Sequence, residues 1–319
     1  MEFEIWAEKY RPKKLSEIIN QKHVVERLKA FVKEGSIPHM LFAGPAGTGK
    51  TTSALALAHE LYGEHWHQNV LEMNASDERK IEDIRTKVKE FARIKPIGNV
   101  PFKIILMDEA DALTADAQQA LRRMMEDYAS VTRFILTCNY SSKIIDPIQS
   151  RCAVFRFKPL EEKDIKKFIE RIVKGEKLKI DEKAVEAVIY ISEGDLRRVA
   201  NLLQAAAILG KKITAELIYE VASRAKPEEV KQMLELALKG NFEKARAMLH
   251  EMLLKQGLSG LDVIAEIHRQ IYKLNLPEQA KIELIEKCGE YEFRISEGAN
   301  ELIQLEALLA NFLLYAKKK

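Results

Sequence analysis

Short apolar runs alternate with amphipathic stretches along the first half of the chain. The apolar runs predict strands at 39–43, 70–74, 102–107, 133–138 and 154–157. Between them, apolar residues recur every three or four positions, which predicts helices at about 24–34, 51–61, 77–93 and 117–128. Because the two patterns alternate throughout, residues 1–159 are expected to form a parallel α/β sheet.

From Leu160 onward the pattern is helical only. Amphipathic segments at 161–174, 181–192, 195–209 and 214–223 predict a small bundle, and five further helical segments follow Lys226-Pro227. We therefore predict three domains: an α/β domain at 1–159, a small helical bundle at 160–226 and an all-helical domain at 227–319. The last helix carries a clear apolar stripe, which we expect to serve the oligomer; its members are Leu302, Leu305, Leu309 and Phe312.

Composition narrows the class of protein only slightly. The net charge of +3 neither demands nor excludes nucleic acid, so any basic binding surface must be local. The three cysteines are scattered without C-x-x-C spacing, which favours a reducing compartment and argues against a zinc module. The charged start of the chain is unlike a signal peptide, and no apolar run approaches the ~20 residues of a membrane helix. We expect a soluble protein inside the cell.

The stretch after the first predicted strand has the residues of a phosphate-binding loop. Glycines allow such a loop to curl so that its backbone N–H groups face a phosphate. The loop ends with a lysine, whose charge can contact the phosphates, and a threonine, whose hydroxyl can bind Mg²⁺. The following helix adds the partial positive charge of its N-terminus. We predict that this phosphate loop binds ATP through Gly44, Pro45, Ala46, Gly47, Thr48, Gly49, Lys50 and Thr51.

Acidic and amide side chains follow two later strands. Asp108 and Glu109 end the strand at 102–107, where Asp108 can reach Mg²⁺ and Glu109 can orient the water that attacks the γ-phosphate. Asp111 is predicted instead to cap the next helix. Asn139 ends the strand at 133–138 and can sense the γ-phosphate, although a plain turn residue fits its spacing as well.

Basic residues occupy two notable helical positions. Arg197 and Arg198 lie in the first turn of a helix, where the dipole disfavours cations unless an anion is nearby, or unless they pair with Glu193 or Asp195. Three further cations recur every fourth residue on one flank of the helix that ends at position 93, and either a DNA-binding stripe or a solvated face explains them; they are Arg85, Lys89 and Arg93.

Taken in order, these motifs resemble those of the AAA+ ATPases, and within them the small subunits of the replication factor C family of sliding-clamp loaders. The motifs are Glu8-Lys9-Tyr10-Arg11-Pro12, the phosphate loop, Asn74-Ala75-Ser76-Asp77, Asp108-Glu109-Ala110-Asp111, Ser150-Arg151-Cys152 and Gly194-Asp195-Leu196-Arg197-Arg198. The resemblance spans the whole chain. It implies that residues 1–159 are a RecA-like nucleotide-binding domain, that residues 160–226 are a helical lid, and that residues 227–319 are an all-helical oligomerisation collar through which five subunits form a ring.

The resemblance also implies roles for single residues. Tyr10 and Arg11 would lie near the adenine and phosphates, Asn139 would be sensor 1, and Arg197 sensor 2. Arg151 would be an arginine finger for a neighbouring subunit. DNA contacts would come from Arg79, Arg85, Lys89 and Arg93.

The implied partners are other loader subunits including a large one, a sliding clamp and primer–template DNA, with no membrane. The implied location is the cytoplasm of an archaeal cell or the nucleus of a eukaryotic one. The four-cysteine zinc module of bacterial loaders and a clamp-binding motif of the form Gln-x-x-aliphatic-x-x-aromatic-aromatic are absent from the sequence.

Two rival functions remain at this stage. A branch-migration helicase or a replication initiator has the same ATPase domain but usually ends in a winged helix, and residues 227–319 show no strand pattern. A binding module that uses nucleotide only to hold an assembly together would not need Glu109 or Arg151.

Overall fold

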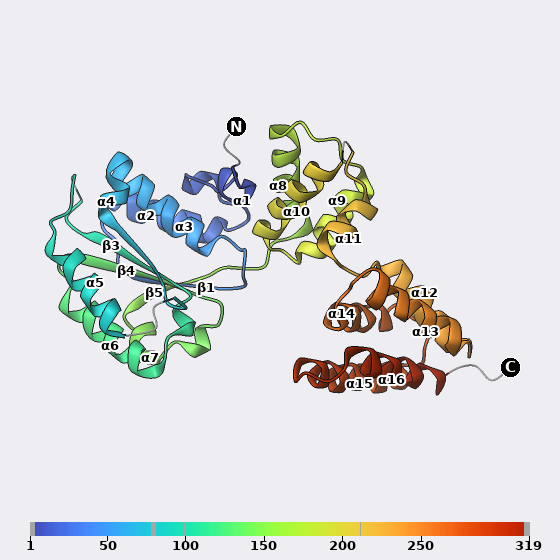
Figure 1. Ribbon diagram of the computed structural model, residues 1–319. Coiled ribbons are helices and arrows are strands. Elements are labelled where there is room, and N and C mark those ends of the chain that lie inside the picture. The colour runs from blue at the N-terminus through green and yellow to red at the C-terminus, as the bar shows by residue number, and fades with distance from the viewer. Residues whose placement is uncertain (1–3, 78–80, 99, 211, 316–319) are drawn as a thin grey trace. The chain divides into compact units, whose positions relative to one another are not determined.

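The structure is a computed structural model that describes residues 4–77, 81–98, 100–210 and 212–315. Its helices and strands separate into two compact units (Figure 1). The first contains Met1–Ile180 and Val188–Ile208, and the second contains Asp181–Ala187 and Leu209–Lys319. The division into three domains after residues 159 and 226 stays a prediction.

One parallel sheet organises the first unit. Its strands are β1 (His39–Ala43), β2 (Val70–Asn74), β3 (Lys103–Asp108), β4 (Thr132–Cys138) and β5 (Cys152–Arg156). Their order across the sheet is β2-β3-β4-β1-β5, and every neighbouring pair is parallel. The predicted α/β class is therefore confirmed, with strand boundaries within two residues of those expected.

Helices cover both faces of this sheet, as long apolar strands require. They are α2 (Lys22–Glu34), α3 (Lys50–Tyr62) and the short α4 (Trp66–Asn69) on one face, and α5 (Ile81–Arg93), α6 (Ala115–Asp127) and the short α7 (Asp146–Gln149) on the other (Figure 1). Alternate residues of β1 enter different cores: Met40 and Phe42 pack with α2 and α3, whereas Leu41 and Ala43 pack with α5 and α6. This double burial holds the ends of the strands in place.

Three more helices belong wholly or partly to the first unit. They are α1 (Trp6–Lys9), α8 (Glu162–Gly175) and α10 (Leu196–Leu209), while α9 (Glu182–Ser192) is divided between the units. The segment around α1 contacts α10, since the Trp6 backbone N–H donates to Gln204 Oε1 at 2.9 Å. This early helix is thus fixed to one that comes much later in the sequence.

The second unit is helical throughout its described residues. Its helices are α11 (Ala215–Ala222), α12 (Pro227–Leu238), α13 (Phe242–His250), α14 (Gly260–Ile271), α15 (Glu278–Ser296) and α16 (Glu301–Leu313), with a π-helical turn at Glu251–Lys255. The five helices α12 to α16 match the five helical segments expected after Lys226-Pro227, and Gly240, Pro277 and Gly298 lie between them. No helix in the described ranges of the chain has the length and apolar character needed to cross a membrane.

The apolar stripe of α16 lies inside this unit. Leu305, Leu309 and Phe312 are almost fully buried in one core with residues of α12 to α15. Our expectation that the stripe serves the oligomer is therefore wrong for these three residues, because neighbouring helices of the same chain already cover them, while the fourth member, Leu302, is half-buried. Any oligomer contact has to use other residues.

Candidate functional site: a nucleotide pocket

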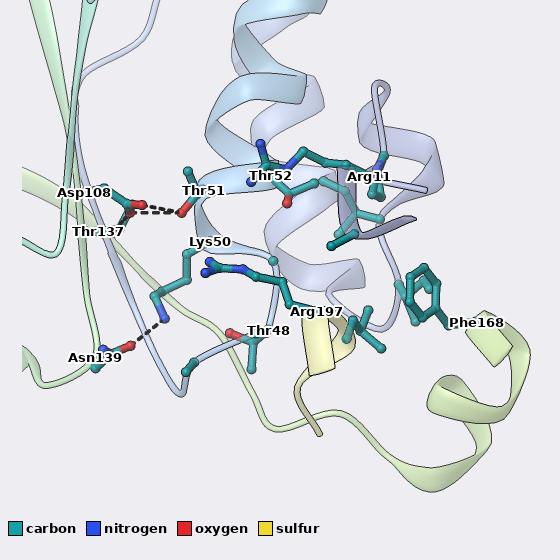
Figure 2. A pocket seen from close by; sticks show the side chains of 18 of the residues that line it. Arg11, Thr48, Lys50, Thr51, Thr52, Asp108, Thr137, Asn139, Phe168 and Arg197 are labelled. Atoms are coloured by element: carbon teal, nitrogen blue, oxygen red, sulfur yellow. Dashed lines mark hydrogen bonds between the residues drawn. The ribbon is translucent and has the colours of Figure 1, made fainter. Parts of the chain in front are cut away.

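A pocket opens at the carboxyl ends of β1, β3 and β4. Residues 46–51 of the phosphate loop, the acidic pair and Asn139 all line it, because the ends of parallel strands meet at one edge of a sheet, whereas Gly44 and Pro45 of the predicted loop are not among the lining residues. Further lining residues come from the N-terminal segment, from α8 and from α10; they include Ala7, Tyr10, Arg11, Pro12, Phe168, Leu196 and Arg197. Figure 2 shows Lys50, Thr51, Asp108 and Asn139 grouped around one part of the pocket.

The three glycines of the phosphate loop are required for different reasons. A Cβ at Gly44 would come within 2.4 Å of the Phe157 carbonyl oxygen. A Cβ at Gly47 would overlap the Asp195 side chain at 2.2 Å, and φ there is +68°. Gly49 has open space around it but a φ of +94°, which side chains rarely allow. A side chain is therefore excluded by close neighbours at Gly44 and Gly47 and disfavoured by the backbone conformation at Gly49.

Lys50 points along the inside of the loop and is only 8% exposed. Its Nζ donates to the Gly44 and Pro45 carbonyl oxygens at 2.7 and 2.8 Å and to Asn139 Oδ1 at 3.0 Å (Figure 2). Burial lowers the pKa of Lys50, and the nearby Asp108 carboxylate opposes that effect. These three acceptors match the three hydrogens of the Lys50 ammonium group.

Thr51 and Asp108 provide a set of hard oxygen ligands. Thr51 Oγ1 donates to Asp108 Oδ1 and Oδ2 at 2.9 and 3.1 Å, and the Thr137 hydroxyl also donates to Asp108 Oδ1. Mg²⁺ prefers such oxygens and takes only one or two protein carboxylates, completing its shell with water and phosphate. In the described ranges of the chain, no group of three or more His, Cys, Asp or Glu side chains could hold a metal by itself. The pair fits a phosphate-bound Mg²⁺.

Glu109 lies beside this pair with an unusual backbone. Its φ is +55°, a left-handed conformation that is uncommon for a residue with a side chain. The Glu109 N–H donates to Thr137 Oγ1 at 3.2 Å, so one threonine contacts both acidic residues. The side chain of Glu109 lines the pocket, as the orienting role for water requires.

The opposite end of the pocket is more apolar. Tyr10 is 8% exposed, and its hydroxyl donates to Glu176 Oε1 at 2.7 Å. Burial, with this hydrogen bond, raises the pKa of Tyr10 to about 12, so its phenol stays protonated at neutral pH. Arg11 also lines the pocket and pairs with Glu8 at 2.9 Å. The sequence did not indicate the other residues at this end: Ile18, Ile19, Phe168 and Leu196.

The two arginines at the start of α10 have different environments. Arg197 lines the pocket and points toward the part that holds Lys50 (Figure 2), whose pKa its charge helps to lower. Arg198 instead pairs with Glu193 at 3.8 Å and donates to the Ile191 carbonyl oxygen at 3.1 Å. Asp195 Oδ1 accepts the Arg197 N–H at 2.8 Å and so caps the helix. Of the alternatives considered from the sequence, the anion-facing position suits Arg197 and the ion pair suits Arg198.

Arg151 does not belong to this pocket. It is absent from the described residues that line it, and its side chain is 37% exposed. Its guanidinium pairs with Glu126 Oε1 at 2.6 Å and donates to the Pro147 carbonyl oxygen at 2.7 Å. Among the described residues, Arg151 is thus held at the surface by Glu126 and Pro147 and not in the pocket of its own chain.

The basic stripe of α5 is exposed. Arg85, Lys89 and Arg93 make no hydrogen bond or ion pair with another residue in the part of the chain that the structure describes. Arg85 and Lys89 border a shallow groove between α5 and α6 that also contains Arg123 and Asp127. Arg79 lies outside the described residues, as do two neighbours at the predicted start of this helix.

Asp111 does not cap the helix that follows it. That helix, α6, is capped by Thr114, whose Oγ1 accepts the Ala117 N–H at 3.3 Å. The Asp111 carboxylate turns instead to the loop after β4. The sequence likewise did not indicate Thr137 as a site residue. Thr137 reaches Asp108 because of the register in which β3 and β4 pair.

Two protein families match parts of the chain. Residues 40–160 match the ATPase family associated with various cellular activities (AAA), and residues 225–311 match the replication factor C C-terminal domain. Curated relatives named replication factor C small subunit match over nearly the whole length. The protein from Staphylothermus marinus is 56% identical over 316 residues, covering 98% of this chain and 96% of its own. That from Archaeoglobus fulgidus is 54% identical and covers 99% of both chains.

Solved structures with this fold include the Thermotoga maritima RuvB Holliday junction branch migration motor. It matches with a TM-score of 0.56 at 21% identity, covering 77% of this chain and 88% of that one. A second structure of the same RuvB, carrying a single threonine-to-valine substitution, gives the same TM-score of 0.56 at 20% identity, covering 81% and 88%. At such identities the likeness concerns the fold alone.

Proposed function

The chain belongs to the replication factor C small-subunit family, whose members are ATPase subunits of a clamp loader, and from that premise we propose how its pocket and surfaces work. ATP binds in the pocket with Mg²⁺, and several such subunits assemble into a ring with one large subunit. ATP binding and hydrolysis drive this ring to open a sliding clamp and to load it onto primer–template DNA during replication. The proposed location is the cell interior, where the chromosome is.

One observation carries the proposal: Lys50, Thr51, Asp108, Glu109, Asn139 and Arg197, which come from separate segments of the chain, line a single pocket. Phosphoryl transfer needs mainly positioning and charge stabilisation, which these side chains supply. A purely structural nucleotide site would not need Glu109 held at a strained φ of +55°.

The roles follow from the contacts. Lys50 exchanges its loop carbonyls and Asn139 for phosphate oxygens, and Asn139 stays within reach to sense the γ-phosphate. Thr51 and Asp108 would hold Mg²⁺, which would supply positive charge to neutralise the phosphates. Glu109 orients the attacking water, and Arg197 stabilises the phosphate charge from α10. Tyr10 and Arg11 bound the end that receives the adenine.

The α5 stripe supports DNA binding without sequence preference. Exposed cations with no described partner can neutralise phosphates without first breaking an ion pair, and backbone contact carries no sequence information. This suits a loader that works on any primer–template junction. The proposed contacts are Arg85, Lys89 and Arg93, with Arg79 added from the resemblance.

The second unit supports an assembly role. Its described residues 212–315 contain helices and no strand, so they lack the β-wing of the rival motors. Residues 225–311 match the C-terminal domain of the family. We propose that this region is the collar of a ring of five subunits, with Arg151 completing the pocket of the neighbour.

Loading of a closed circular clamp onto primed circular DNA tests the function directly. The assembled loader should load the clamp with ATP, and Glu109→Gln should bind ATP and the clamp without releasing it onto DNA. ATP hydrolysis that is indifferent to clamp and primed DNA, but that moves a Holliday junction, would instead favour the branch-migration alternative.

A further inference from the structure

The carboxylate of Asp111 is directed at the loop that carries Asn139. Asp111 lies in the short helical turn Ala110–Ala112 that follows the acidic pair of β3. Its Oδ2 accepts the backbone N–H groups of Asn139 and Tyr140, each at 3.1 Å. Two successive N–H groups converging on one carboxylate oxygen form a small anion nest, and such charge-assisted bonds are stronger than neutral ones.

Neither helix capping nor Mg²⁺ binding accounts for a carboxylate at position 111 in the described structure. The helix cap is supplied by Thr114, and the Mg²⁺ ligand is Asp108. Just beyond the end of β4, the Cys138 carbonyl oxygen still accepts the Gly44 N–H at 3.2 Å, but Asp111 is the one partner described for the N–H groups of Asn139 and Tyr140. Without Asp111, these two backbone donors would lose that partner and the peptide at 139–140 could rotate.

Rotation of that peptide would move the Asn139 amide. Its Oδ1 now accepts from Lys50 Nζ at 3.0 Å, so the side chain is aligned with the ammonium that meets the phosphates. We propose that Asp111 is a positioning residue for ATP hydrolysis, acting through Asn139 by fixing the backbone from which the sensing amide projects. The inference rests on the proposed role of the pocket and adds a residue that contacts neither nucleotide nor Mg²⁺.

A double-mutant cycle in the assembled loader tests it. Asn139→Ala should lower kcat by about 10²-fold, the loss typical of one preorganised polar group. Asp111→Ala should lower kcat by about 10-fold and never by more than Asn139→Ala, with ATP affinity from a fluorescent-nucleotide titration within about threefold of wild type. The double variant should match Asn139→Ala alone, since a residue that acts through another has no further effect once that one is gone.

Two further variants keep the test decisive. Asp111→Asn retains an acceptor oxygen and should recover most of the activity even if Asp111→Ala folds poorly. Asp116→Ala removes an exposed carboxylate from the first turn of α6 and should leave kcat unchanged. Additive losses in the double variant, or a larger loss for Asp111→Ala than for Asn139→Ala, would overturn the inference while leaving the ATPase function intact. Absence of hydrolysis by the wild-type assembly would instead overturn the function.

Discussion

The cations in the nucleotide pocket and the cations on the outer surface of the same unit differ in what holds them. Lys50 is 8% exposed and donates to three oxygens of its own chain. The α5 stripe is exposed without a described partner, and Arg151 is 37% exposed and paired with Glu126. The buried cation is held in place by its own chain, whereas the exposed ones are accessible from solvent, and the proposed roles of the two groups differ accordingly.

The largest expected effect comes from substitutions in the nucleotide pocket, where Lys50 is buried. Lys50→Ala removes the ground-state phosphate contact and should abolish ATP binding, while Glu109→Gln acts only on the attacking water and should keep binding but stop hydrolysis. Equilibrium titration with a fluorescent nucleotide, alongside phosphate release, separates the two. Equal loss of affinity in both variants would show that the assigned roles are wrong.

The next largest effect is expected from Arg151→Ala, which removes one of the exposed cations. A single subunit should bind ATP almost normally, because Arg151 is outside its own pocket, but the assembly should lose on the order of 10³-fold or more in hydrolysis rate. Mixing this variant with Lys50→Ala subunits places an intact pocket beside an intact finger, and part of the activity should return. A mixture as inactive as either parent, in assemblies confirmed by mass, would rule out action on the neighbour.

Neutralising the α5 stripe should have a smaller, salt-dependent effect. The triple variant Arg85→Ala, Lys89→Ala, Arg93→Ala should bind all DNA sequences more weakly and lower the slope of log K against log salt by roughly 2 to 3. Single-subunit ATP affinity, which depends on the buried cation, should stay constant and serves as the control. If the slope is unchanged, the stripe is a solvated face.

The smallest effect is expected from Glu126→Gln. Exposed ion pairs contribute about 0.2–1 kcal/mol, so freeing Arg151 from Glu126 should raise the hydrolysis rate of the assembly by less than about fivefold. Steady-state phosphate release at low and high salt measures this, and screening should shrink the difference. A large fall in rate would mean that Glu126 holds Arg151 in its working position.

Much of this arrangement follows from the sequence because its causes are local. Apolar runs predicted the strands within two residues, and parallel strands bring Lys50, Asp108 and Asn139 to one edge whatever the details of packing. The helices of the second unit were equally clear, since glycines and prolines separate them.

The remainder depends on contacts that spacing does not encode. Thr137 meets Asp108 only because β3 and β4 pair with Met107 opposite Leu136. The burial of α16 depends on which helices surround it, and a stripe made for a core looks like one made for a partner. Glu176 reaches Tyr10 across 166 positions, and nothing near either residue in the sequence indicates the other.

The close approach of Gly47 to Asp195 has a consequence for how such sequences vary. A methyl group at 47 would overlap the side chain and the Cα of Asp195, so neither position can change without regard to the other. Because the overlap includes the Cα of Asp195, a smaller residue at 195 would not relieve it, and we expect any side chain at 47 to be accompanied by a shifted helix start at 195. Glycine at position 47 is therefore required both by the phosphate-binding loop and by the close packing of a helix start far downstream in the sequence.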